Sequence, residues 1–146
     1  MHLCRFDQNF RHNAIEILGD DMRRQYHFRQ IGEDIYIWDV HRLVKLTNKF
    51  VAKRVQLVNI QELNEAYWFP DQSPTTQQII EHFQLVQEAD LSYPIILCAQ
   101  GRVMDGMHRV AKASLLKQTE ILAVRFEQTP EPDFINVSED DLNYDE

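Results

Sequence analysis

Short apolar runs, bounded by turn residues, predict the strands of this chain. Five runs have the β-rich composition that is typical of strands. They span residues 35–38, 51–60, 94–98, 102–104 and 121–126. Only Ala99, Gln100 and Gly101 separate the third run from the fourth, which predicts a tight hairpin. A hairpin among intermixed helices and strands favours an α+β fold over a strictly alternating parallel sheet.

The N-terminal third of the chain has one clear helical pattern. Apolar positions at helical spacing predict a helix over 40–47, with Asp39 as its N-cap and Asn48 at its end. A weaker pattern predicts another helix over 6–18. The polar segment 20–32 is expected to be mostly loop.

Two longer helices are predicted in the second half of the chain. Ser73 in the N-cap position and Pro74 in the first helical position start one that runs to about Ala89. Its inward side is expected to be Ile79, Ile80, Phe83, Val86 and Gln87. The other helix covers 107–117. Its apolar stripe is expected to be Met107, Val110, Ala111, Ser114 and Leu115.

Composition excludes several classes of protein. The 146 residues suit one domain with a real apolar core. No apolar run is long enough to span a membrane, and the first residues lack the apolar core of a secretory signal. Cys4 and Cys98 are the two cysteines, and their spacing suits neither a disulfide framework nor a zinc motif. Such cysteine usage is typical of the reducing cytoplasm, where we expect this protein.

The net charge of −8 is concentrated at the C-terminal end. From Glu127 to Glu146 the chain carries eight acidic residues and no Lys or Arg. We interpret 128–146 as an acidic tail on a neutral body and expect the body to fold without it. Basic residues gather in 41–56, which contains no acid; they are Arg42, Lys45, Lys49, Lys53 and Arg54. This stretch is either a polyanion-binding face or an ordinary solvated surface.

The segment that carries chemistry is Gly101-Arg102-Val103-Met104-Asp105-Gly106-Met107-His108-Arg109. It combines a strand, a glycine turn and a helix start, where free backbone N–H groups and the helix dipole favour an anion. A first helical turn disfavours cationic side chains, and a bound phosphate would remove this conflict for His108 and Arg109. The amides of Met107 and His108 would complete the site. In the alternative interpretation, Asp105 is a simple N-cap and both cations are solvated.

The glycine turn and its surroundings resemble the signature of the ParB/sulfiredoxin superfamily. The resemblance rests on Asp105-Gly106-Met107-His108-Arg109, on the hairpin before it and on the helix that continues as Val110-Ala111-Lys112-Ala113. It covers residues 50–127 and is clearest over 93–126. It implies a ParB/sulfiredoxin-like domain, a small mixed sheet flanked by helices. Residues 1–49 would then be an N-terminal extension packed on that core.

The resemblance also implies a pocket for nucleotide phosphates. In this family the glycine turn, the histidine and the arginine grip phosphates, which corresponds here to Gly106, His108 and Arg109. Hydroxyl groups at the start of the preceding helix add contacts in some members; here they are Ser73, Thr75 and Thr76. The expected ligand is a nucleoside di- or triphosphate with Mg²⁺. Family activities include CTP hydrolysis, sulfinic acid reduction and ADP-dependent serine phosphorylation, and the fold does not choose among them.

An enzyme of this kind needs a carboxylate within reach of a substrate hydroxyl. Asp105 can act as that base or hold Mg²⁺ through water. Glu62, just after the opening strand, is the other candidate, with Glu65 beside it. The protein would then be a phosphotransferase or a nucleotide hydrolase. The alternatives are a non-catalytic interaction module that keeps the pocket only as structure, and a ParB-like nucleic-acid-associated protein.

Departures from the family pattern narrow these expectations. Met107 stands where sulfiredoxins have a nucleophilic cysteine, so sulfinic acid reduction is not expected. Partition proteins carry an arginine pair in this turn and continue into a helix-turn-helix domain. Here the helix starts Gly-Met-His-Arg, and the acidic tail would repel DNA, so DNA binding is not expected.

Three other features have two interpretations each. The aromatic cluster Tyr67-Trp68-Phe69 either stacks on a ligand base or packs in the core. Cys98 lies on a predicted strand, where a buried small hydrophobe is more typical than a reactive thiol. His82 has no second ligand at metal-binding spacing and is expected at the surface.

Overall fold

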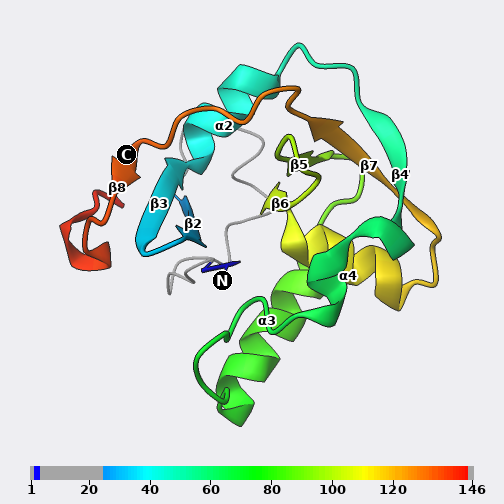
Figure 1. Cartoon of the computed structure of the whole chain (residues 1–146). Coiled ribbons are helices and arrows are strands. Elements are labelled where there is room, and N and C mark those ends of the chain that lie inside the picture. The colour runs from blue at the N-terminus through cyan, green and yellow to red at the C-terminus, as the bar shows by residue number, and fades with distance from the viewer. Residues whose placement is uncertain (1, 4–24, 145–146) are drawn as a thin grey trace.

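The computed structural model describes residues 2–3 and 25–144, and the expected helix over 6–18 lies outside them. The described chain contains three α-helices and two four-stranded sheets, which Figure 1 shows as separate layers. The α+β class is therefore confirmed. Within the described residues, no helix has the length and apolar content to cross a bilayer.

The first sheet is built from the middle and later part of the chain. Its strands, in spatial order, are β4 (Lys53–Gln56), β7 (Glu120–Arg125), β5 (Ile95–Leu97) and β6 (Val103–Asp105). Strands β5 and β7 run parallel, and the other two pairs are antiparallel. The predicted hairpin is confirmed as β5–β6, and the long predicted strand 51–60 is confirmed only over β4.

The second sheet contains β1 (His2–Leu3), β2 (Tyr26–Ile31), β3 (Asp34–Asp39) and β8 (Phe134–Ile135). The expectation of loop over 20–32 is wrong for β2, which pairs with β3 along its whole length. The polar residues His27 and Arg29 concealed this strand. They are buried like their neighbours Tyr26 and Phe28, so burial does not follow the alternation of polar and apolar residues along the strand.

The helices are α2 (Val40–Thr47), α3 (Thr76–Glu88) and α4 (Met107–Leu115). Helix α2 is confirmed with its predicted cap, because the Asp39 carboxylate accepts a hydrogen bond from the His41 N–H at 2.9 Å. Helices α3 and α4 lie together below the first sheet in Figure 1.

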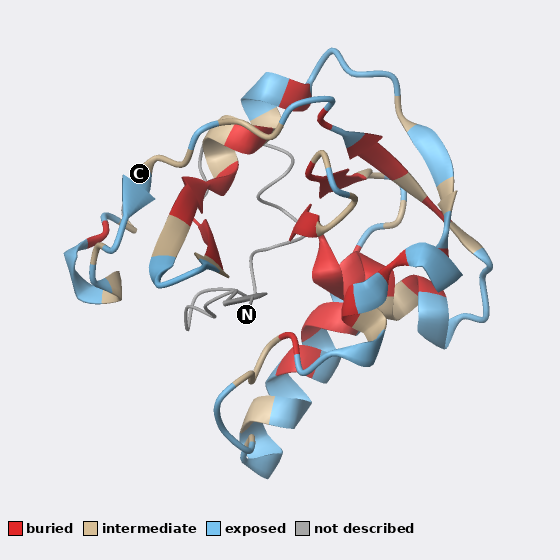
Figure 2. Ribbon diagram, in the orientation of Figure 1, coloured by how far each residue is buried: buried red, intermediate tan, exposed pale blue. Residues whose placement is uncertain are grey.

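The first sheet separates two apolar clusters. On one side Ile95 and Leu97 pack against Met107 and Val110 of α4. On the other side the cluster includes β3 and α2; its buried members are Trp38, Leu43, Ile96, Cys98, Met104, Val124 and Phe126. Figure 2 shows buried positions in the first sheet, in the part of α4 beneath it, and in β3 and α2. The glycine turn between β6 and α4 is therefore held between two cores.

The start of α3 differs from the prediction. The N-cap is Thr75, whose hydroxyl accepts from the Gln78 N–H, while the Gln78 side chain accepts from the Thr75 N–H. This reciprocal capping box satisfies two backbone donors, which Ser73 with Pro74 cannot do. Both of those residues lie before the helix.

The buried faces of α3 and α4 also differ from the predicted stripes. Ile79, Ile80 and Phe83 are about half exposed, and α3 instead buries His82, Leu85 and Val86. In α4 the stripe is wrong at Ser114 and Leu115, which are exposed. The helix instead buries His108 and Arg109. Both helices therefore turn polar residues inward, because these residues find partners there.

The acidic segment packs on the protein. Strand β8 pairs with β3, and Leu142 is 7% exposed in a cluster with Tyr26 and Phe28. The indole N–H of Trp38 donates to the Pro130 carbonyl at 2.8 Å. These contacts attach the acidic segment to the second sheet, while its other residues are mostly exposed. The expectation that the body folds without this segment stays a prediction.

Candidate functional site

The turn between β6 and α4 requires glycine at position 106. Gly106 has φ +103°, in the left-handed region that favours glycine. A Cβ there would lie 2.6 Å from Nη2 of Arg109 and 2.7 Å from Cγ2 of Ile95. The chain therefore approaches the Arg109 guanidinium and the sheet more closely than any side chain allows.

An ion pair closes the turn. Nη2 of Arg109 lies 3.0 Å from Oδ2 of Asp105, and both side chains are almost fully buried. Asp105 is thus the partner of Arg109, and the interpretation of Asp105 as a simple N-cap is wrong. Gly106 takes the N-cap position without a side-chain hydrogen bond. Nε of Arg109 is buried and has no hydrogen-bond partner among the described residues.

His108 lies in a cluster of aromatic rings. Its Nε2 is 3.0 Å from Nδ1 of His82, and the Trp68 ring stacks on it at a centroid distance of 4.7 Å. Trp68 also contacts the His82 ring at 4.5 Å, and Phe69 meets His82 edge to face. His82 is 5% exposed, so the expectation of a surface histidine is wrong. In the aromatic cluster Tyr67 is buried, whereas Trp68 and Phe69 are half-buried and pack on the two histidines; stacking on a ligand base stays a prediction.

Burial keeps this histidine pair uncharged at neutral pH. Desolvation lowers the pKa of His82 to about 4. Desolvation, followed by the charges of His82 and Arg109, lowers the pKa of His108 well below its usual value. His108 therefore offers a phosphate no positive charge at neutral pH. Arg109 is the cation of this turn.

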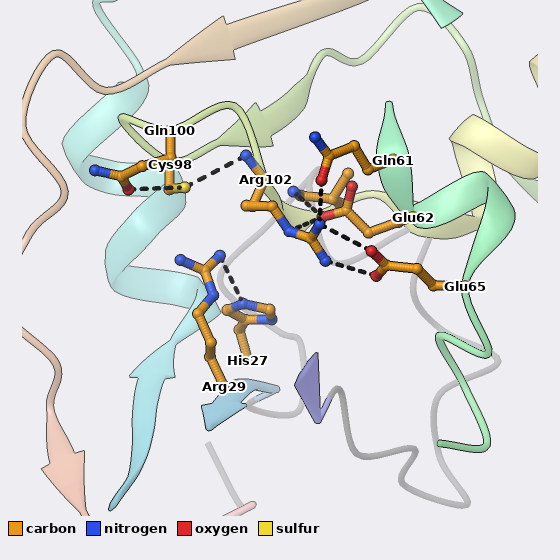
Figure 3. A network of polar contacts seen from close by, with 9 residues as sticks. His27, Arg29, Gln61, Glu62, Glu65, Cys98, Gln100 and Arg102 are labelled. Carbon is orange, nitrogen blue, oxygen red and sulfur yellow. Dashed lines mark hydrogen bonds and ion pairs between the residues drawn. The ribbon is translucent and has the colours of Figure 1, made fainter. Parts of the chain in front are cut away.

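Glu62 belongs to a second polar network (Figure 3). Its Oε2 accepts from the Val103 N–H at 2.7 Å and lies 3.2 Å from Nε of Arg102. Arg102 also binds Glu65 through two nitrogens and donates to Gln61 at 2.8 Å. Glu62 is 1% exposed, and these contacts position β6. Its candidate role as a catalytic base stays a prediction.

Cys98 lies at the other side of the same network. It is fully buried as expected, and its Sγ accepts from the Arg102 N–H at 3.3 Å. Burial raises the pKa of the Cys98 thiol, but the Arg29 charge and hydrogen bonds from the backbone bring it below its usual value. Arg29 is itself buried, 3.3 Å from Nε2 of His27 and above the Trp38 ring. The polar contacts of Cys98 could not be predicted from the sequence around it, because Arg29 belongs to a strand of the other sheet.

The hydroxyl residues that were predicted to bind phosphate form no direct hydrogen bond to the turn. Thr75 uses its hydroxyl to cap α3. Among the described residues, no hydrogen bond joins Ser73, Thr75 or Thr76 to the segment 105–109. Their role in ligand binding stays a prediction that follows from the resemblance.

A hollow of about 200 Å³ lies between α2 and the first sheet, and Asp105 is its acidic lining residue. Typical pockets for small organic ligands are larger, at roughly 300–1,000 Å³. In the described part of the chain, no group of three or more His, Cys, Asp or Glu side chains is placed to hold a metal ion.

Comparison of the chain with protein-family models, with curated proteins and with solved structures gave no match. The functional interpretation therefore depends on the geometry of the turn and on the sequence resemblance.

Proposed function

We propose that this protein binds a phosphate-bearing small molecule, a nucleoside di- or triphosphate, at the turn between β6 and α4. One observation carries the proposal. Arg109 is a buried cation beside Gly106, at a helix N-terminus without a side-chain cap, and its Nε has no partner among the described residues. A buried donor without an acceptor is costly, and an oxygen of a bound phosphate is a suitable acceptor.

The strand order supports the family assignment that we propose with it. A mixed sheet flanked by α3 and α4, with a strand–glycine–helix turn, fits the ParB/sulfiredoxin-like domain that the sequence resembles. The segment that resembles the family, 50–127, contains this entire sheet. The second sheet uses residues from outside that segment at both ends.

The residues suit a phosphate better than a metal held by the protein. Asp105 binds Arg109, so its carboxylate already has a cationic partner. Mg²⁺ prefers carboxylate and phosphate oxygens, and here it would enter on the phosphates of the ligand. Among the residues of the turn, only Asp105 lines the hollow of about 200 Å³, so the proposal does not depend on that hollow.

A non-catalytic interaction module is the second candidate. The observation that favours it is the outer face of α3, where Ile79, Ile80 and Phe83 are each 51–52% exposed. In this case the Asp105–Arg109 pair and the histidine pair serve only to hold the fold together.

Melting of the wild type with ATP, ADP, CTP and GTP, each with Mg²⁺, tests the proposal. Ligand at 100 times its Kd would raise stability by about 2.7 kcal/mol. Arg109→Lys keeps the charge but removes the planar fork and Nε. We expect this variant to fold and to lose at least about tenfold in affinity.

Arg54→Lys, the same change on an exposed strand residue, is the matched control and should bind as the wild type does. If no nucleotide shifts the melting of the wild type, the phosphate site is refuted and the interaction module becomes the better account.

A further inference from the structure

A second, larger cleft lies at the other end of the first sheet. Its volume is about 790 Å³, within the range of small-molecule sites. It is lined by Phe50, Val51, Lys53, Ala99, Arg125, Phe126, Glu127 and Gln128. The parallel strands β5 and β7 end here, since Leu97 is paired with Arg125. Crevices at the carboxyl ends of parallel strands are common ligand sites in α/β sheets.

Two phenylalanines form an aromatic wall of this cleft. The Phe50 and Phe126 rings meet edge to face, with centroids 5.5 Å apart and an interplanar angle of 79°. Phe126 is 6% exposed, whereas Phe50 is 39% exposed. The Phe50 N–H also donates to the Thr47 carbonyl, which fixes the backbone at the end of α2. An exposed ring held by a buried one offers a rigid surface for a planar ligand.

Two cations line the same cleft. Lys53 is paired with Ala123 across β4 and β7, and Arg125 lies two residues further along β7. Such diagonal neighbours share a face, with a spacing of about 7–8 Å that a phosphate can bridge. Arg125 donates to the Ala99 carbonyl, which holds its guanidinium at the hairpin. Neither cation forms an ion pair with a described residue, and Glu127 is the acidic residue in the lining.

We propose that this cleft binds a planar aromatic ring that carries a phosphate, the chemistry of a nucleoside monophosphate. The ring packs on Phe50, and the phosphate lies between Lys53 and Arg125. The inference does not depend on the proposed function, since none of the residues 105–109 lines the cleft, although the hollow beside Asp105 shares Phe50 with it. The same chemistry is present in a free mononucleotide and at the phosphorylated end of a single nucleic acid strand.

Calorimetric titration with AMP, CMP, adenosine and inorganic phosphate tests this site. We expect the monophosphates to bind at least tenfold more tightly than adenosine or phosphate alone, because only they use both halves of the cleft. Phe50→Leu keeps the apolar bulk but removes the ring, and Lys53→Gln removes one cation. Each variant should weaken AMP binding by about tenfold.

Arg54→Gln is the matched control. It removes one charge from the neighbouring residue of β4, which is not among the residues that line the cleft, and should leave AMP affinity unchanged. The proposal is overturned if the wild type binds no monophosphate, or if Phe50→Leu and Lys53→Gln both bind AMP as the wild type does. It is also overturned, with the proposed function left standing, if AMP binding is lost in Arg109→Lys and kept in Lys53→Gln.

A final experiment distinguishes a free mononucleotide from the phosphorylated end of a nucleic acid strand as the ligand of the cleft. A 5′-phosphorylated oligodeoxynucleotide of ten adenines is compared with AMP, with the unphosphorylated strand as its control. Tighter binding of the phosphorylated strand supports the cleft with a strand end as its ligand. Equal or weaker binding, with AMP bound, supports it with the free mononucleotide.

Discussion

The two ends of the first sheet use cations in opposite ways. At the β6–α4 turn, Arg109 is 3% exposed and paired with Asp105 at 3.0 Å. At the ends of β5 and β7, Lys53 and Arg125 are exposed, and neither forms an ion pair within the described chain. The turn is therefore fixed by its own contacts, whereas the cleft has charge and volume available for a ligand.

This difference shows what a motif can and cannot reveal. The turn is one continuous segment, so its glycine and arginine are visible in the sequence. The cleft collects residues from three separate segments, and only the fold brings them together. A recognisable motif thus marked the buried end of the sheet, whereas at the open end the sequence marked only the basic stretch that contains Lys53.

The largest effect is expected from breaking the buried pair. Arg109→Ala leaves the Asp105 carboxylate buried without its cation, which typically costs about 3–5 kcal/mol. Lys53→Ala at the open end should change the free energy of unfolding by less than about 0.5 kcal/mol. Urea denaturation of both variants measures the difference. Equal stability of the two would contradict the account of the turn.

The next largest effect is expected from replacing the glycine at each end of the sheet by alanine, which should cost different amounts of stability. A Cβ added to Gly101, which has φ +83°, would lie at an ordinary 3.5 Å from Arg125, whereas the closest contact of a Cβ at Gly106 would be 2.6 Å. Gly101→Ala therefore costs only the left-handed strain of about 1–2 kcal/mol. Gly106→Ala adds a steric clash with the Arg109 guanidinium and the buried Ile95, and should lose clearly more. Thermal unfolding of both variants measures the two losses of stability. A smaller loss in Gly106→Ala than in Gly101→Ala would be incompatible with this packing.

Acid should destabilise the turn through its histidine pair. The pKa of His82 is about 4 in the folded protein, below about 6.5 in the unfolded chain, so unfolding takes up a proton between these values. Stability should therefore fall as the pH drops from 7 to 5, by roughly 1–2 kcal/mol for His82. His82→Gln should flatten this slope in urea titrations. An unchanged slope in His82→Gln would show that folding does not lower the pKa of His82.

The smallest expected difference between the two ends of the sheet is in their response to salt. Exposed charges are screened within about 8 Å at physiological ionic strength, and buried ones much less. AMP binding at the cleft should therefore weaken several-fold between 50 and 500 mM NaCl, on the order of 1 kcal/mol. The unfolding free energy that Arg109→Ala removes should stay nearly constant over this range. Calorimetry and urea denaturation at both salt concentrations make the comparison, and a salt-independent AMP affinity would place the ligand away from Lys53 and Arg125.

Local patterns in the sequence were enough for the regular part of the fold. The β5–β6 hairpin and α2 with its Asp39 cap follow from turn residues and apolar spacing. The expected faces of α3 failed because His82 is drawn inward by Trp68 and His108, which lie in other segments. A polar residue that is buried by such partners carries no signal in a hydrophobicity pattern.

The candidate site, like the fold, could be predicted from the sequence only in part. Gly106 and Arg109 were identified from their segment, and the structure places them in contact range. The ion pair with Asp105 and the uncharged state of His108 depend on burial, which the spacing of residues does not reveal. Arg29, beside Cys98, comes from a strand that was expected to be a loop.

The Nε–H resonance of Arg109 tests the central claim most directly. In ¹⁵N-labelled protein it is assigned by comparison with Arg109→Lys, and then followed during titration with ADP and Mg²⁺. The account predicts a saturable shift of this resonance, with smaller shifts at the Met107 and His108 amides. A resonance that stays in place while the ligand binds elsewhere, or a titration without any change, would contradict a phosphate site at this turn.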